Sequence, residues 1–149
     1  MNHTGMLDFT IDTAKQAGSI LMQHFGEIST IERKSTEIDL VTIADTQSEA
    51  FIIEQIKTNY SQHQIIAEES DLQNGDSNYR WIIDPLDGTT NFVHNLPIFA
   101  VSIGLQYKEQ TILGVVYNPA ADKCFVAEKD GGALLNGNPI HTTSTNTLS

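Results

Sequence analysis

Four short β-strand patterns follow one another in the second half of the chain, separated by tight-turn residues. Phe99–Tyr107 and Thr111–Tyr117 flank three polar residues and predict a hairpin. Lys123–Glu128 and Gly132–Leu135 predict two further strands, and Asn136–Gly137 is a strong tight-turn signal. Strands joined this closely pair with their neighbours, so the pattern predicts an antiparallel sheet that needs a covering layer on at least one face.

Two helical patterns precede these strands. Apolar residues at steps of three and four over Leu7–Phe25 predict a helix, with Gly26 as its C-cap. Thr46–Glu49 fits a capping box and predicts a second helix over about Asp45–Tyr60. Between them, Ile38–Val41 predicts a short strand or an extended approach to that helix. The fold class is therefore α+β, with two N-terminal helices packed on a mostly antiparallel sheet.

The bulk properties narrow the class of protein. The 149 residues have the size of one domain, taken as 1–149, and the formal net charge of −11 argues against nucleic acid as a partner. No apolar run approaches the roughly twenty residues of a membrane span, and no signal peptide is visible at the N-terminus. The single Cys124 excludes an internal disulfide and is expected to be a buried, inert thiol. We expect a cytoplasmic protein that does not bind membranes.

Three acidic residues stand at the ends of predicted strands. Glu68 follows the short strand Gln64–Ala67, and Asp84 ends a strand that begins at Tyr79. Asp87 follows three residues later. Hard cations such as Mg²⁺ take oxygen ligands, mainly carboxylates with a few carbonyls and waters. We therefore expect these carboxylates to converge on a metal site.

The residues around Asp84 suit such a site. Pro85 fixes its own φ and biases Asp84 to an extended conformation, after which the chain turns and exposes the Leu86 carbonyl. Gly88 allows close approach of a ligand, and Thr89–Phe92 predicts a short helix whose first N–H groups can hold phosphate oxygens. A second interpretation stays open, in which the same residues form an ordinary turn and a threonine cap.

Several motifs together resemble the inositol monophosphatase family. The stretch Asp-Pro-Leu-Asp-Gly-Thr-Thr-Asn-Phe over 84–92 is similar to the family's first signature. Ala67–Ser70 resembles its Gly-Glu-Glu-Ser element, with alanine in place of glycine. Asp39–Asp45, Gly114–Pro119 and Gly131–Gly137 resemble further family segments. The resemblance implies the N-terminal half of an αβαβα sandwich, in a family whose proteins are nearly twice this long.

The resemblance also implies roles for individual residues. Glu68 would bind the first metal and orient the attacking water, Asp84 would bridge two metals, the Leu86 carbonyl would bind the first metal and Asp87 the second. The remaining implied roles concern water and phosphate: Thr89 would hydrogen-bond the nucleophilic water, Asp45 would polarise the Thr89 hydroxyl, and Gly88, Thr89 and Thr90 would hold phosphate oxygens.

The implied activity is Mg²⁺-dependent hydrolysis of a phosphate monoester. Two or three Mg²⁺ ions would take part, Li⁺ would inhibit, and the protein would be a homodimer. The sequence Thr90-Asn91-Phe92 favours inositol 1-phosphate or a related sugar or polyol phosphate, and fructose-1,6-bisphosphatase activity stays open. The family's second signature, with another aspartate ligand, has no counterpart in this chain. A half-domain that binds metal or protein without turnover is therefore the alternative.

A few other residues are weaker candidates for the functional site. Lys34 stands where the family has a basic residue near the metal, and a solvated lysine is an equal interpretation. Glu69 would support the site or face solvent. The five histidines show no zinc-ligand spacing, and Trp81, Phe92 and Phe99 are expected in the core.

Overall fold

The computed structural model describes residues 4–26, 34–67, 75 and 77–147, with side chains described from residue 5 in the first helix and residue 41 in the second. The helices are α1 (Thr4–His24), α2 (Lys34–Asn59) and α3 (Thr89–Val93). The strands are β1 (Gln64–Ala67), β2 (Tyr79–Asp87), β3 (Ala100–Tyr107), β4 (Gln110–Asn118), β5 (Lys123–Glu128), β6 (Gly132–Leu135) and β7 (Asn138–Ile140).

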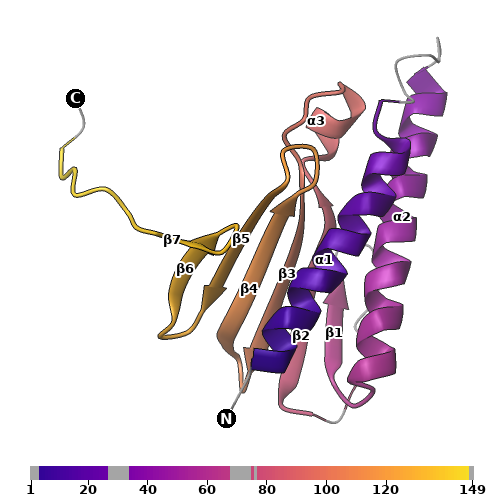
Figure 1. Cartoon of the computed structure of the whole chain (residues 1–149). Coiled ribbons are helices and arrows are strands. Elements are labelled where there is room, and N and C mark those ends of the chain that lie inside the picture. Colours follow the sequence, from indigo (N-terminus) through magenta and orange to yellow (C-terminus); the bar gives the residue numbers. More distant parts are fainter. Residues whose placement is uncertain (1–3, 27–33, 68–74, 76, 148–149) are drawn as a thin grey trace.

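The strands form one seven-stranded sheet in sequence order, β1 to β7. β1 pairs with β2 in parallel, and every later pair is antiparallel. Figure 1 shows α1 and α2 side by side along one face of this sheet, with α3 at one end of the strands. The predicted α+β class with a mostly antiparallel sheet is confirmed.

The core lies between the two long helices and the sheet. Ala14, Ala17 and Leu21 of α1 are fully buried, as are Ile52 and Ile56 of α2. From the sheet, inward side chains include the buried Trp81, Val101, Ile103, Leu105, Leu113 and Val115. Gly18 permits close approach of α1 to β4, because a Cβ there would lie 2.8 Å from the Tyr117 ring.

The predicted tight turn at Asn136–Gly137 is present, and the polar link predicted over residues 108–110 is shorter than expected, because β4 already begins at Gln110. Lys108 and Glu109 connect β3 to β4 with φ of 49° and 65°, and Asn136 and Gly137 connect β6 to β7 with φ of 48° and 81°. Two successive positive φ values are typical of the turn whose twist matches paired strands. The predicted bounds of β5 and β6 agree with the structure.

Two boundary predictions are wrong. The second helix begins at Lys34 rather than near Asp45, so Ile38–Val41 is helical and not extended. The physical reason is visible where side chains are described: Val41, Ala44, Ser48, Ile52 and Ile56 are buried at helical spacing, so the stripe facing the sheet begins upstream of the capping-box letters. The first long strand also does not stop at Asp84–Pro85, because β2 continues to Asp87.

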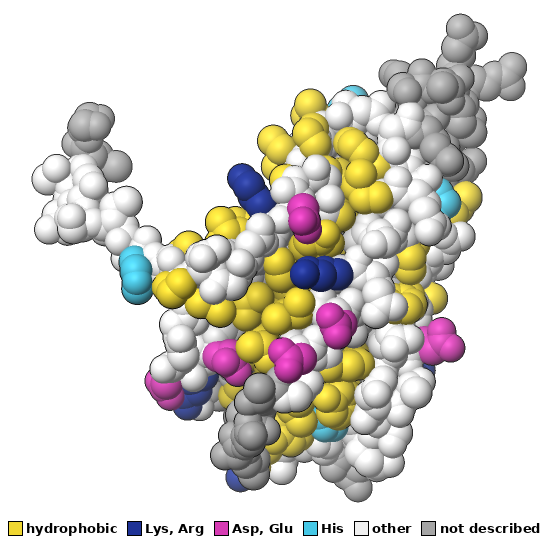
Figure 2. All heavy atoms as spheres, viewed as in Figure 1, with side chains coloured by type: hydrophobic (Ala, Val, Ile, Leu, Met, Phe, Trp, Pro, Cys, Tyr) yellow, Lys and Arg dark blue, Asp and Glu magenta, His cyan; other side chains and the backbone are white. Residues whose placement is uncertain are grey.

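The helices leave part of the sheet uncovered. Figure 2 shows hydrophobic side chains gathered over the part of the sheet that lies beside α1. A groove of about 520 Å³ lies there, with Leu7 and Ile11 of α1 facing Val126 and Leu134 of the sheet. On the other face, Ile82, Val116 and Phe125 are each about 40% exposed. No helix within the described residues is long and apolar enough to cross a membrane.

Candidate functional site

The chain changes register at the end of β2. Asp84 pairs with Ser102 and Asp87 with Ala100, so three steps along β2 match two steps along β3. This is a β-bulge, in which one extra residue leaves the ladder locally unpaired. Proline is tolerated in a sheet at such a bulge because its missing N–H costs no ladder bond there. The predicted turn at Pro85 is thus a bulge within a continuing strand.

Hydrogen bonds fix the peptide unit that joins Pro85 to Leu86. The Leu86 amide donates to Asp84 Oδ1 at 3.2 Å, which is an Asx turn. The Ser48 hydroxyl of α2 donates to the Pro85 carbonyl at 3.2 Å. The Leu86 side chain is 2% exposed and anchors the bulge in the core. Asp84 is half-buried and Asp87 exposed, so two carboxylates flank a rigid bulge.

Gly88 turns the chain from β2 into α3. Its φ of 90° and ψ of 37° are left-handed, and it is the N-cap of α3. A Cβ at this position would lie 3.0 Å from the Ile98 carbonyl oxygen and 3.3 Å from Phe99 Cα, so both the conformation and the space favour glycine. Among the described residues no side chain caps α3, so the threonine-cap interpretation is not observed. The first N–H groups of this helix have no intrahelical acceptor.

Three phenylalanines hold α3 in place. Phe92 is fully buried, and its ring centroid lies 4.9 Å from Phe99 and 5.5 Å from Phe25. Phe25 in turn lies 4.9 Å from Phe99. The end of α1, α3 and the approach to β3 therefore share one aromatic cluster. Thr89 and Thr90, on the same short helix, are exposed and accessible to a ligand.

Asp45 and Ser48 come from the same helix. Asp45 is half-buried with its Oδ1 buried, and it precedes Ser48 by three residues on α2. Because side chains three apart share a helix face, Asp45 lies on the side from which Ser48 reaches Pro85. α2 also contacts both β2 and α3, the elements that carry Asp84 and Thr89.

The remaining predicted ligands fall outside what the structure describes. Glu68 and Glu69 lie outside the described residues, and Lys34 begins α2 without a described side chain. The last residue of β1, Ala67, pairs in parallel with Ile83, the residue before Asp84. The structure therefore brings together the elements of Asp45, Asp84, Leu86, Asp87, Gly88, Thr89 and Thr90 and leaves the Glu68 prediction untested.

A recess of about 320 Å³ opens beside the bulge. Asp87, Gly88 and Asn91 form its polar side, and Val116 and Phe125 lie on its apolar side. Asn91 donates to the Ile98 carbonyl at 2.7 Å and so holds the loop that follows α3. The recess can admit a small molecule next to the Asp87 carboxylate.

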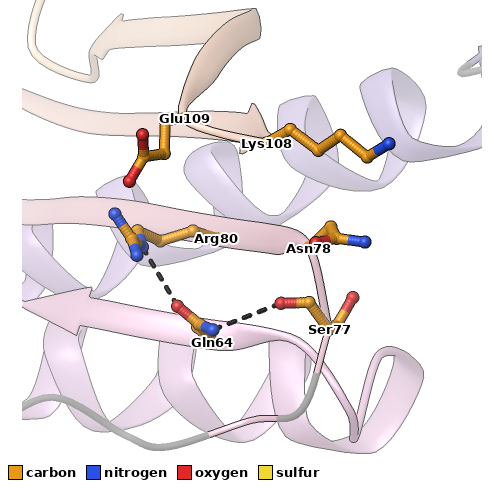
Figure 3. A pocket seen from close by; sticks show the side chains of 6 residues that line it. All are labelled: Gln64, Ser77, Asn78, Arg80, Lys108 and Glu109. Carbon is orange, nitrogen blue, oxygen red and sulfur yellow. Dashed lines mark hydrogen bonds between the residues drawn. The ribbon is translucent and has the colours of Figure 1, made fainter.

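Figure 3 shows a different pocket, at the opposite end of the strands. Glu109 lies beside Arg80, and the Lys108 side chain extends away from them. Arg80 Nε donates to Gln64 Oε1 at 3.1 Å. Arg80 and Asp87 stand seven residues apart on β2, which corresponds to about 23 Å at about 3.3 Å per residue. This pocket is separate from the bulge, and its described lining includes the basic Arg80 and Lys108 beside a single carboxylate, Glu109.

The donors around the bulge fit a hard cation. The Asp84 and Asp87 carboxylates and the Leu86 carbonyl all offer oxygen, the ligand that Mg²⁺ prefers. Within the described part of the chain, no three His, Cys, Asp or Glu residues cluster as a metal site would require. The predicted fourth donor, Glu68, lies outside the described residues, so the metal site stays a prediction.

Two residues of the site were not predicted. The sequence pattern assigns Ser48 only to a capping box. Its position within the apolar stripe of α2 was the signal that could have predicted a buried polar contact. Asn91 was seen only as a motif letter, and its bond across to Ile98 depends on a fold that the local sequence does not specify.

Comparison with known proteins places these features in a family. A family model described as the inositol monophosphatase family matches residues 2–149. Inositol monophosphatase 3 of Solanum lycopersicum is 41% identical over 146 residues, covering 95% of this chain and 54% of that protein. The Nus factor SuhB of Escherichia coli K12 is 42% identical over 134 residues, covering 89% and 50%. The fructose-1,6-bisphosphatase/inositol-1-monophosphatase of Thermotoga maritima is 37% identical over 142 residues, covering 95% and 55%.

Solved structures show the same similarity. The extragenic suppressor protein suhB of Bartonella henselae superposes with a TM-score of 0.85 at 34% identity, covering 95% of this chain and 55% of that chain. The chain spans about half the length of the curated relatives that it matches.

Proposed function

The chain belongs to the inositol monophosphatase family, and from this premise we propose that it carries the Mg²⁺- and phosphate-binding part of a phosphomonoesterase. The observation that carries the proposal is the bulge that leads directly into the left-handed Gly88 and α3. Two carboxylates, a carbonyl and the start of a helix follow one another there within a few residues. Few arrangements offer metal ligands and phosphate-binding N–H groups so close together.

The residues proposed to hold Mg²⁺ when it is bound are Glu68, Asp84, Leu86 through its carbonyl, and Asp87. Their chemistry supports the assignment, because all four donate oxygen. Bound Mg²⁺ supplies positive charge that neutralises the phosphate and makes a nearby water a stronger nucleophile. The need for such charge is plain, since the chain itself has a net charge of −11.

The roles proposed for protein groups concern water and phosphate. Asp45 accepts a hydrogen bond from the Thr89 hydroxyl and so polarises it, which leaves the Thr89 oxygen to hydrogen-bond the attacking water, while Glu68 orients that water. The N–H groups at Gly88, Thr89 and Thr90 hold phosphate oxygens, supported by the exposed start of α3 and its lack of a described side-chain cap.

The substrate proposed is inositol 1-phosphate or a related sugar or polyol phosphate. The tomato and Thermotoga relatives carry inositol monophosphatase in their names, and the latter also carries fructose-1,6-bisphosphatase. The second activity is therefore the first alternative to test. A half-domain that binds metal or protein without turnover is the other alternative. Homodimer formation, inhibition by Li⁺ and a cytoplasmic location stay predictions.

Phosphate release tests the proposal directly. Inositol 1-phosphate and fructose 1,6-bisphosphate would be supplied separately at rising Mg²⁺ concentration, to the wild type and to Asp87→Asn. Asp130→Asn is the matched control, because Asp130 is an exposed aspartate in the turn between β5 and β6. We expect Mg²⁺-dependent release from the wild type and Asp130→Asn and its loss in Asp87→Asn. Release by Asp87→Asn equal to that of the wild type would reject the proposed role of Asp87, and no release by the wild type would reject catalysis by this chain.

A further inference from the structure

Ser48 is a buried polar residue to which the proposed function gives no role. It is fully buried on α2, within the stripe of otherwise apolar side chains that faces the sheet. Its hydroxyl donates to the Pro85 carbonyl, 37 residues away along the chain, at 3.2 Å. A buried hydroxyl on an apolar stripe destabilises the fold unless it is hydrogen-bonded, and the Ser48 hydroxyl finds its acceptor at the bulge.

The peptide unit between Pro85 and Leu86 is held at both of its polar atoms. Ser48 donates to its carbonyl, and its N–H donates to Asp84 Oδ1 at 3.2 Å. At a bulge these groups lack the ladder partners that a regular strand would supply. Together with the φ and ψ of Leu86, the orientation of this peptide plane determines where the Leu86 carbonyl points, and its N–H restrains the Asp84 carboxylate that accepts it.

We infer that Ser48 is a positioning residue for the metal site, acting through the Pro85–Leu86 peptide to orient the Asp84 carboxylate and the Leu86 carbonyl. The inference rests on the proposed function, because that function supplies the metal. The two hydrogen bonds that hold the Pro85–Leu86 peptide are observed in this chain without it. Ser48 touches neither metal nor substrate. Groups that orient metal ligands without binding the metal commonly affect metal affinity by about tenfold or more when removed.

The test compares Ser48→Ala and Ser48→Thr with a matched loss of a buried hydroxyl elsewhere. Thr10→Val is that control, because Thr10 is fully buried on α1 and its hydroxyl donates to the Met6 carbonyl at 2.6 Å. The hydrogen bond of Thr10 stays within α1 and involves neither Pro85 nor Leu86. Thr10→Val therefore reports the general effect of losing a buried hydroxyl that does not bond to the bulge.

Two readouts separate this inference from the proposed function. Calorimetric titration with Mg²⁺ alone should give about tenfold weaker binding for Ser48→Ala, and wild-type binding within about twofold for Ser48→Thr and Thr10→Val. In metal-free protein, amide exchange at Leu86 should accelerate in Ser48→Ala and stay unchanged in Thr10→Val.

The outcomes are distinct. If the wild type binds Mg²⁺ and Ser48→Ala binds it equally well, the positioning role is wrong while the proposed function stands. If the wild type binds no Mg²⁺, the proposed metal site is wrong. In that case faster exchange at Leu86 in Ser48→Ala would still support the hold of Ser48 on the peptide, and unchanged exchange would overturn it.

Discussion

Replacing Gly88 with alanine should damage both the stability of the fold and the candidate site. A non-glycine residue at the observed φ of 90° costs about 1–2 kcal/mol. The added methyl would also lie 3.0 Å from the Ile98 carbonyl oxygen and 3.3 Å from Phe99 Cα, both backbone atoms that cannot move cheaply. Overpacking of this kind costs a further 1–3 kcal/mol or so. We expect a total loss of about 3 kcal/mol, or roughly 6–12 °C in Tm for a domain of this size.

Gly137→Ala isolates the steric part of this cost. Gly137 has a φ of 81°, and a Cβ there would meet nothing within 4 Å. It should therefore lose only the conformational part, about 1–2 kcal/mol. Thermal unfolding followed by circular dichroism gives the comparison, and calorimetric Mg²⁺ titration at 20 °C shows whether the residual folded protein keeps its site. Equal losses in Tm for the two variants would refute the close approach of Gly88 to the Ile98–Phe99 backbone, and undiminished Mg²⁺ binding by Gly88→Ala would refute the need for this turn.

Three further predictions follow from contacts outside the bulge. Burial lowers the pKa of His63 below its usual 6.5, and His63 Nδ1 accepts a hydrogen bond from Trp81 Nε1 at 3.0 Å, so the folded state favours neutral histidine. The contribution of His63 to stability should be complete above about pH 6.5 and should fall as the pH drops toward the lowered pKa, with a matching change in Trp81 fluorescence. A Tm that stays constant between pH 7 and 5 would contradict this prediction. Burial raises the pKa of the Cys124 thiol, so a disulfide reagent at pH 8 should label it only after denaturation, and fast labelling of native protein would show that the thiol is accessible. Asn91→Ala should lose the bond to the Ile98 carbonyl and about 1 kcal/mol of stability by urea unfolding, whereas a loss below about 0.3 kcal/mol would show that this bond is not a net contributor.

The sheet could be predicted from the sequence because its signals are local. Lys108-Glu109 and Asn136-Gly137 sit between alternating runs, and all four residues adopt the positive φ that such turns need. The core positions of Trp81, Phe92 and Phe99 followed in the same way from their place in apolar segments, and all three are buried. Local pattern and global fold agree in these elements, which is why neighbouring residues were sufficient to predict them.

The two wrong boundary predictions concern residues whose local pattern is compatible with two different structures. Thr46–Glu49 has the letters of a capping box, but the helix already extends through it from Lys34, and its serine is used for a long-range bond. Pro85 normally ends a strand, yet β2 absorbs it in a bulge. Both outcomes depend on how α2 packs against β2, which single-sequence patterns do not specify.

The roles predicted for the candidate site stay predictions, but the local backbone can be compared with the sequence. Asp84, Leu86, Asp87 and Gly88 were expected at a turn, and the structure has a bulge at the end of β2 instead. What the sequence could not supply was the contribution of α2, because Ser48 meets Pro85 only after the helix has docked on the sheet.

The central claim is tested most directly by locating a bound divalent metal with NMR. Substoichiometric Mn²⁺, added to isotope-labelled protein, broadens NMR signals of nuclei near its site. The account predicts that amides over residues 84–90 broaden first, that Asp87→Asn weakens the effect, and that amides of Arg80 and Lys108 at the far end of the strands keep their intensity. Broadening centred on Arg80 and Lys108, or spread evenly over the acidic surface, would contradict a metal site at the β2–α3 turn.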